Sequence, residues 1–305
     1  YQKRAVETLS RARICFNALL KIQHLLELQE EMVRLSESFA EKIALRVKAG
    51  RTSPVELSQA KISLMRNKLS LESLKKQYII AKQQLSYLWS GGESDFDRVL
   101  GQLEIGVDMP RLDLFLSRIE QNRELCHIQR EIRLNASRLR LEQARRKPDP
   151  VISGGLKRHN DSGSLGFSIG FAMPLPLKRI NEGAILKANI LLKQAEAALQ
   201  QEKIVIKNQL IASHQRLKNA FESAVALKKQ ILPEARAAYV AISKGYIMGK
   251  FSYLAVVAAY RTQLEVTEEY LNHAENYHNI HAEMEQMVGG CDATSKILAQ
   301  SRSKL

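Results

Sequence analysis

This sequence of 305 residues is poor in the residues that break or cross-link a chain, with only 15 glycines, 7 prolines and 3 cysteines. So few breaking residues predict long helices rather than a globule dense in turns. The cysteines, Cys15, Cys126 and Cys291, are isolated and odd in number. They argue against a disulfide framework or a thiolate metal site. No run of eighteen apolar residues occurs, so we expect no transmembrane helix.

Positive charge exceeds negative charge, with 46 Lys and Arg against 32 Asp and Glu and a net charge of +14. The basic residues are spread along every predicted helix and interleaved with acids, and no basic stripe with stacking aromatics stands out. Solvated helix faces therefore explain the charge better than a nucleic-acid partner. The sequence also lacks a nucleophile elbow, a phosphate loop and paired carboxylates in a pocket, so we expect no catalytic residue, no cofactor and no enzyme activity.

One β-hairpin interrupts the helical pattern between Lys147 and Leu177. Its second strand alternates large apolar residues with small ones over about nine residues, the length of a tilted strand that crosses a bilayer. The large residues, which we expect to face lipid, are Leu165, Phe167, Ile169, Phe171 and Met173. A lone hairpin would leave backbone groups unpaired in hydrocarbon. The hairpin therefore either belongs to a closed barrel assembled from several copies, or it lies outside a membrane.

The helical parts contain an internal duplication. The segment that begins at Gly50 aligns with the segment that begins at Gly249, an offset of 199 residues, and the same offset carries Gly91 onto Gly290. In each copy a long helix reaches a glycine, a serine caps the next helix, and the chain reverses. In the first copy Ser53, Pro54 and Glu56 predict a capping box. These two sites are expected to be the tips of helical hairpins.

The predicted order is helix, tip, helix, linker, helix, β-hairpin, helix, tip, helix, which makes the fold class mainly α with a small β part. A bend is expected at Pro233. If the duplication is complete, an upstream helix and a first β-hairpin precede Tyr1. The expected domains are a first helical hairpin (1–90), a linker (91–110), a helix (111–147), the β-hairpin (148–176), a second helical hairpin (177–290) and a flexible tail (291–305).

Several short motifs together resemble the TolC-type outer-membrane efflux proteins, and within them the cobalt–zinc–cadmium resistance branch. Each motif alone is weak, but they follow the family's order over essentially the whole chain. The matching stretches are Leu232-Pro233-Glu234-Ala235, Gly245-Tyr246, Gly249-Lys250-Phe251-Ser252-Tyr253-Leu254, Arg261-Thr262, Lys147-Pro148-Asp149-Pro150, Pro174-Leu175-Pro176-Leu177, Asn181 and Gly183.

The resemblance implies a homotrimer in the bacterial outer membrane, in which every subunit gives four strands to one shared barrel and long helices to a periplasmic tunnel. It further implies a passive duct for heavy-metal cations, without a cofactor. Its helix tips would meet a periplasmic adaptor that connects the duct to an inner-membrane pump of the resistance-nodulation-division (RND) class. Carried over by position, the tip contacts are Gly50, Arg51, Thr52, Ser53, Gly249, Lys250, Phe251 and Ser252.

The chain departs from the family pattern after the second tip. Many relatives carry acidic residues there that narrow the tunnel mouth, whereas the matching positions are Ala255 and Ala258. Only Glu56, after the first tip, keeps a carboxylate. The resemblance therefore makes Glu56 the candidate for charge at the tunnel mouth, although a capping role explains this residue better.

Three histidines on one predicted helix invite a metal-site hypothesis. His278 and His281 have helical i, i+3 spacing, but His273 does not join them, and two imidazoles make a poor site. We therefore expect no metal site. Two other functions stay open: a structural coiled-coil scaffold, and the periplasmic adaptor itself. The bracketed β-hairpin argues against the scaffold, and the absence of a lipoyl-like segment argues against the adaptor.

Overall fold

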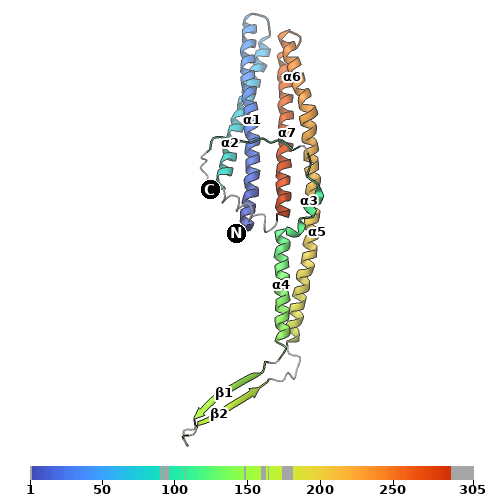
Figure 1. Cartoon of the computed structure of the whole chain (residues 1–305). Helices are drawn as coiled ribbons and strands as arrows, with labels where there is room; N and C mark the ends of the chain where they lie inside the picture. The colour runs from blue at the N-terminus through green and yellow to red at the C-terminus, as the bar shows by residue number, and fades with distance from the viewer. Residues whose placement is uncertain are drawn as a thin grey trace. The chain divides into compact units, whose positions relative to one another are not determined.

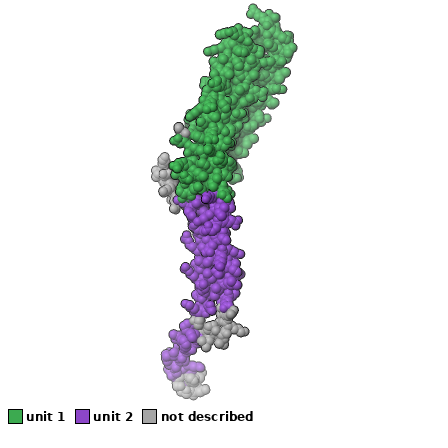
Figure 2. Space-filling view, turned by 90° about the vertical axis from the view of Figure 1, so that its right-hand side faces the viewer, with its two compact units in different colours: residues 1–118, 208–305 green, residues 119–207 purple. Residues whose placement is uncertain are grey.

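The structure is a computed structural model that describes residues 2–89, 91, 96–106, 108–147, 149–158, 163, 165–173 and 181–289, with the side chains of residues 2–7 left out. The chain forms two compact units (Figure 2). Unit 1 comprises residues 1–118 and 208–305, and unit 2 comprises residues 119–207. None of the helices in the described ranges is both long and apolar enough to cross a bilayer.

Unit 1 is built from helical hairpins (Figure 1). Helix α1 (Gln2–Lys48) turns into α2 (Pro54–Ser86), and α6 (Leu232–Ile247) turns into α7 (Tyr253–Val288). Polar pairs join α1 to α7: Arg13 to Glu285 at 2.7 Å, Asn17 to Asn279 at 3.0 Å and Lys21 to Glu275 at 2.6 Å. The two hairpins of unit 1 therefore lie side by side along α1 and α7.

The core of unit 1 consists of separate apolar clusters along the helices. One cluster lies where α1 meets the end of α2 and is centred on Leu19, Leu20, Leu85 and Leu271. A second lies beneath the two turns and contains Phe39, Ile43, Ala60, Tyr253 and Val256. Burial of these side chains removes apolar surface from water and holds the hairpins together.

An extended segment, residues 96–106, crosses the helices of unit 1 and is held by hydrogen bonds to its backbone. Gln23 of α1 accepts from the Val99 N–H and donates to the Val99 carbonyl, both at 3.2 Å. Tyr270 of α7 donates to the Leu103 carbonyl at 3.3 Å. The side chains of Val99 and Leu103, which belong to this segment, are buried. The predicted linker is thus an ordered part of the core.

The long helical stretch that begins at Glu182 is irregular near Pro233. Helix α5 (Glu182–Ala226) passes into a π-helical turn, η2 (Leu227–Ile231), before α6 begins at Leu232. Proline has no N–H to donate to the preceding turn, and its ring crowds the carbonyl four residues earlier. A wider π turn is one way to accommodate such a residue. The structure thus has a π-helical turn just before Pro233, and the bend expected at this proline stays a prediction.

The expectation of one continuous helix over residues 112–147 is wrong. The structure has α3 (Leu112–Leu116), a short 3-10 helix η1 (Ile119–Gln121) and then α4 (Arg123–Ala144). The reason is Asn122, whose side-chain oxygen accepts from the N–H groups of Glu124 and Leu125 and so starts a new helix.

In unit 2, α4 runs alongside the first part of α5 (Figure 1). Lys203 pairs with Glu120 at 2.8 Å near one end, and Asn181 donates to the Glu142 carboxylate at 2.6 Å near the other. These links bring the start of one helix to the end of the other, so the two are antiparallel. Leu125 of α4 and Ala188 and Ala195 of α5 are buried.

The β-hairpin of unit 2 consists of β1 (Val151–Arg158) and β2 (Leu165–Ala172), paired antiparallel. In the observed register Ile152 faces Phe171, Gly154 faces Ile169 and Leu156 faces Phe167. Ile152 and Leu156 of β1 therefore share one face with the large apolar residues of β2, as period-2 alternation requires, whereas Val151 pairs with Ala172 on the other face. The prediction of a mainly helical chain with one small β-hairpin is confirmed.

Candidate functional site

The turn between α1 and α2 is closed by a Schellman motif. The Arg51 N–H donates to the Arg46 carbonyl at 2.8 Å, and the Gly50 N–H donates to the Val47 carbonyl at 2.9 Å. Gly50 has a φ of 69°. Only glycine adopts this left-handed conformation without strain, which is why this residue ends the helix.

The turn between α6 and α7 repeats this geometry bond for bond. The Lys250 N–H donates to the Gly245 carbonyl at 2.8 Å, and the Gly249 N–H donates to the Tyr246 carbonyl at 2.9 Å. Gly249 has a φ of 75°. Donors, acceptors and the left-handed glycine all lie 199 residues after their counterparts, so the duplication seen in the sequence holds at the level of single hydrogen bonds. We call these two turns the first tip (residues 44–58) and the second tip (residues 243–256).

A serine caps the helix that leaves each tip, as the sequence predicts. Ser53 accepts from the Val55 N–H at 3.2 Å, and Ser252 accepts from the Ala255 N–H at 3.3 Å. The predicted capping box of Ser53 and Glu56 is wrong. The Ser53 hydroxyl accepts from Val55 while the Glu56 N–H donates to the Ser53 carbonyl at 3.1 Å, and the Glu56 carboxylate accepts from the Thr52 hydroxyl at 2.8 Å. Thr52, four residues before Glu56, supplies the donor that the box assigns to the Ser53 backbone.

The two tips differ in the side chains that they carry. The ring of Phe251 packs on Gly245, and a Cβ at that glycine would come within 2.3 Å of the ring. Beneath it, Phe39 of α1 contacts Tyr246 and Tyr253, with ring centroids 5.3 Å and 5.1 Å apart. Tyr253 is 3% exposed, and burial raises the pKa of its phenol. The second tip is thus supported by an aromatic cluster that reaches across to α1.

Sequence reasoning missed the apolar residues that the second tip presents. Ile247 and Met248 are 84% and 70% exposed, and both precede Gly249 directly. The signal that could have found them is two large apolar residues at a helix end, where the periodic apolar stripe no longer explains them.

The apolar face of the β-hairpin is also exposed. Its predicted lipid-facing residues have exposed fractions of 75% (Leu165), 71% (Phe167), 74% (Ile169), 69% (Phe171) and 45% (Met173). Met173 follows the last residue of β2. On the opposite face Ser168 donates to the Gly155 carbonyl at 3.2 Å. A contiguous apolar face of this kind indicates a contact with lipid or protein.

Two histidines of α7, His278 and His281, take part in hydrogen bonding and ring packing. His278 donates to the Glu104 carbonyl at 3.1 Å, and His281 lies against Phe115 and Tyr277. Burial lowers the pKa of His278, and the proximity of His281 adds to this effect. In the described part of the chain, no group of three or more His, Cys, Asp or Glu residues could hold a metal ion.

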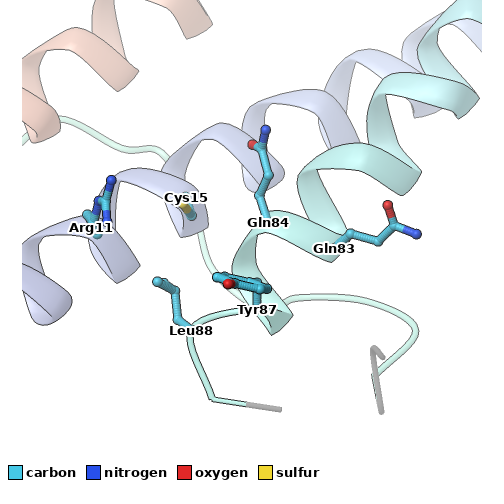
Figure 3. Close-up of a pocket in the computed structure, with 6 residues that line it drawn as sticks. All are labelled: Arg11, Cys15, Gln83, Gln84, Tyr87 and Leu88. Atoms are coloured by element: carbon cyan, nitrogen blue, oxygen red, sulfur yellow. The ribbon is translucent and has the colours of Figure 1, made fainter. Parts of the chain in front are cut away.

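Of the three cysteines, Cys15 and Cys126 lie in the described part of the chain, and both are free and half-buried. Cys15 is half-buried at a hollow of about 590 Å³ between α1 and the end of α2, with Arg11 on the same helix and Tyr87 and Leu88 across from it (Figure 3). Cys126 lies 4.0 Å from the Glu120 carbonyl. Cys291 lies outside the described residues.

Comparison with known proteins agrees with this geometry. No family model matches the chain. The chain is 29% identical over 260 residues to the cobalt-zinc-cadmium resistance protein CzcC of Cupriavidus metallidurans, a match that covers 84% of this chain and 61% of CzcC. The chain therefore spans less than two thirds of that relative.

The fold is shared with solved outer-membrane proteins. The outer-membrane channel OprN matches 95% of this chain and 67% of its own, with a TM-score of 0.74 and 16% identity. The outer membrane protein VceC of Vibrio cholerae matches 93% of this chain and 70% of its own, with a TM-score of 0.65 and 17% identity. The resemblance inferred from the motifs is thereby confirmed: the chain has the fold of the TolC-type outer-membrane channels, and its sequence is related to that of a cobalt–zinc–cadmium resistance protein.

Proposed function

We propose that this protein is the exit duct of a tripartite efflux system of the RND type, lies in the outer membrane and carries heavy-metal cations out of the periplasm. The observation that supports this most directly is the apolar face of the β-hairpin. Its four large apolar residues, Leu165, Phe167, Ile169 and Phe171, are each at least 69% exposed. Their burial in hydrocarbon would stabilise the protein in a membrane by about 1.5–3 kcal/mol for each side chain.

A single hairpin cannot satisfy its outer edges in lipid. Strands β1 and β2 pair with each other, and the described residues contain no third strand. Each unpaired N–H or C=O costs several kcal/mol in hydrocarbon. The proposed assembly is therefore a homotrimer in which hairpins from several copies close one barrel.

The helical hairpins of unit 1 suit a periplasmic tunnel, and their tips suit a docking surface for a periplasmic adaptor. In this reading the residues from Gly50 to Ser53 and from Gly249 to Ser252 contact the adaptor, and Glu56 supplies charge at the tunnel mouth. The duct is passive and performs no reaction, so the inner-membrane pump selects the cargo. Heavy metals are proposed because the relative CzcC is named for resistance to cobalt, zinc and cadmium.

The test is complementation with the full-length gene product. It would be expressed in a Gram-negative host that lacks its own metal-efflux duct but keeps the matching adaptor and pump. We expect restored growth on cobalt, zinc or cadmium and a trimeric mass in detergent. A monomer that stays in the aqueous phase, or no gain of resistance to any metal, would contradict the proposal. Resistance to drugs alone would leave the duct but change its cargo.

A further inference from the structure

The two tips carry unbalanced positive charge. Five basic side chains lie within them, Arg46, Lys48 and Arg51 in the first tip and Lys244 and Lys250 in the second, and all five are exposed. Glu56 is the single acid in the same ranges. Within the described residues, none of the ion pairs involves any of the five.

The helix dipole explains only part of this charge. Cations in the last turn of a helix are stabilised by about 0.3–1 kcal/mol each, which covers Arg46, Lys48 and Lys244. Arg51 and Lys250 lie beyond the helix ends, just before the next helix begins. A helix N-terminus favours acids, yet the first turn of α7 contains none. Among the described residues, the charge at the second tip therefore has no ion-pair partner.

Apolar surface accompanies the charge at both tips and is more extensive at the second. In the first tip the exposed large apolar residues are Leu45 and Val55, at 66% and 63%. Ile247 and Met248 are 84% and 70% exposed, and Phe251 and Leu254 are each 47% exposed. Their counterparts 199 residues earlier are Lys48, Ala49, Thr52 and Val55, of which only Val55 is a large apolar residue. Exposed apolar side chains gathered at one turn mark an interaction surface.

The second tip is also held in one conformation before any partner arrives. The left-handed Gly249, the two Schellman hydrogen bonds and the Ser252 cap fix the backbone, and the Phe251 ring rests on Gly245. A preformed surface loses less conformational entropy on binding than a mobile loop does.

From these observations we infer that the second tip is the main docking surface for the adaptor, and that the adaptor presents there an apolar pocket bordered by carboxylates. This inference rests on the proposed function. The apolar side chains at Ile247, Met248 and Phe251 enter the pocket, and Lys244 and Lys250 meet the carboxylates. The first tip adds positive charge that attracts the same acidic partner.

The experiment measures binding of the purified adaptor of the same efflux system to the full-length protein in detergent. We expect Met248→Asp to weaken binding roughly a hundredfold, because it removes an apolar anchor and places a carboxylate against carboxylates. Lys250→Glu should weaken binding roughly tenfold, and added salt should narrow that difference. Met248→Leu, which keeps volume and polarity, should bind as the wild type does.

Two controls separate docking from general effects. Lys76→Glu makes the same charge change on the exposed face of α2 and should leave the affinity unchanged. An adaptor in which one tip carboxylate is replaced by lysine should regain affinity for Lys250→Glu. Melting temperatures of all variants check that the fold is intact.

The possible outcomes distinguish a failure of this inference from a failure of the proposed function. Wild-type affinity in both Met248→Asp and Lys250→Glu would overturn the inference while leaving the duct in place, whereas failure of the wild-type protein to bind the adaptor would overturn both. A larger loss from Arg51→Glu than from Lys250→Glu would make the first tip the main surface. Binding to vesicles of phosphatidylcholine and phosphatidylglycerol in equal parts, lost in the same variants, would assign the tip to an anionic membrane instead.

Discussion

The ring of Phe251 lies against the backbone of Gly245, so closely that a Cβ on the glycine would come within 2.3 Å of the ring atom Cδ2. The equivalent positions in the first tip are Thr52 and Arg46. An aromatic ring therefore covers the backbone of the second tip. The first tip has the exposed, charged side chain of Arg46 at the position of the glycine. This difference makes the second tip the more informative place for mutation.

Gly245→Ala should displace the Phe251 ring without unfolding the tip. Alanine favours a helix by up to about 1 kcal/mol over glycine, which offsets the local crowding. We expect the free energy of unfolding to change by less than about 1 kcal/mol, and the affinity for the adaptor to fall several-fold. Chemical denaturation and a binding titration check the two quantities. An unchanged affinity would show that the ring position is irrelevant to docking.

Gly249→Val should strain the turn, because a β-branched residue at a φ of 75° costs about 1–2 kcal/mol. No atom lies within 4 Å of the added Cβ, so the cost is conformational. We expect intact trimers but reduced metal resistance and weaker crosslinking to the adaptor. Gly183→Ala, in a helix with open space around it, is the control and should preserve resistance. Normal resistance in Gly249→Val would count against docking at this tip.

A charge on the apolar face of the hairpin should block membrane insertion. Ile169→Lys is expected to destabilise the inserted form by about 2–4 kcal/mol if the residue lies near the bilayer midplane. Ser168→Lys places the same charge on the other face and should be tolerated better. Outer-membrane fractionation and heat stability in detergent would reveal the difference. Equal behaviour of the two variants would argue against a lipid-facing surface.

Glu56→Gln tests charge at the tunnel mouth. Three symmetry-related carboxylates would attract cations, and salt would screen that attraction. We expect lower cation selectivity in single-channel recordings of Glu56→Gln at low salt. Glu56→Ala should in addition remove the acceptor of the Thr52 hydroxyl and an acid from the first turn of α2, at a cost of about 1 kcal/mol. Unchanged selectivity would leave Glu56 with a structural role alone.

The stability of unit 1 should depend on pH through the protonation of His278. Burial lowers its pKa in the folded state below the ordinary 6.5, so the unfolded chain binds the proton more tightly. Its contribution to stability is therefore fully present above about pH 6.5 and is lost as the pH falls toward the folded pKa. Thermal melts of His278→Gln, which keeps a donor for the Glu104 carbonyl, should lose less stability on acidification than the wild type. Parallel losses would exclude His278 as the source.

The tips and the hairpin could be predicted because their causes are local. A left-handed glycine followed by a capping serine, or a strict alternation of large and small residues, is readable from neighbouring positions alone. The helix break at Asn122 is also local, but an asparagine inside a periodic segment is weak evidence for a cap.

The ordered segment 96–106 could not be predicted from sequence, since its backbone is satisfied by residues far along the chain. Gln23 lies 76 positions before Val99, and Tyr270 lies 167 positions after Leu103. Glycine and aspartate around this segment suggest a plain linker, and nothing in its own composition reveals these distant partners. The bonding of Glu56 differs from the prediction for a local reason, because the Thr52 hydroxyl four residues earlier is a competing donor.

The π-helical turn at Leu227–Ile231 also sets the rotational phase of everything that follows it. One residue more per turn advances the helix by about 100°, so α6 presents to α7 a different side from the one a regular helix would present. Within the turn itself Lys228 reaches Glu104 at 3.2 Å, and the hydrogen bond to the Glu104 side chain raises the pKa of the lysine. Removing one residue from the turn would swing α6 around its axis and carry the second tip with it. The angular setting of that tip is thus fixed some twenty residues before the chain reaches it.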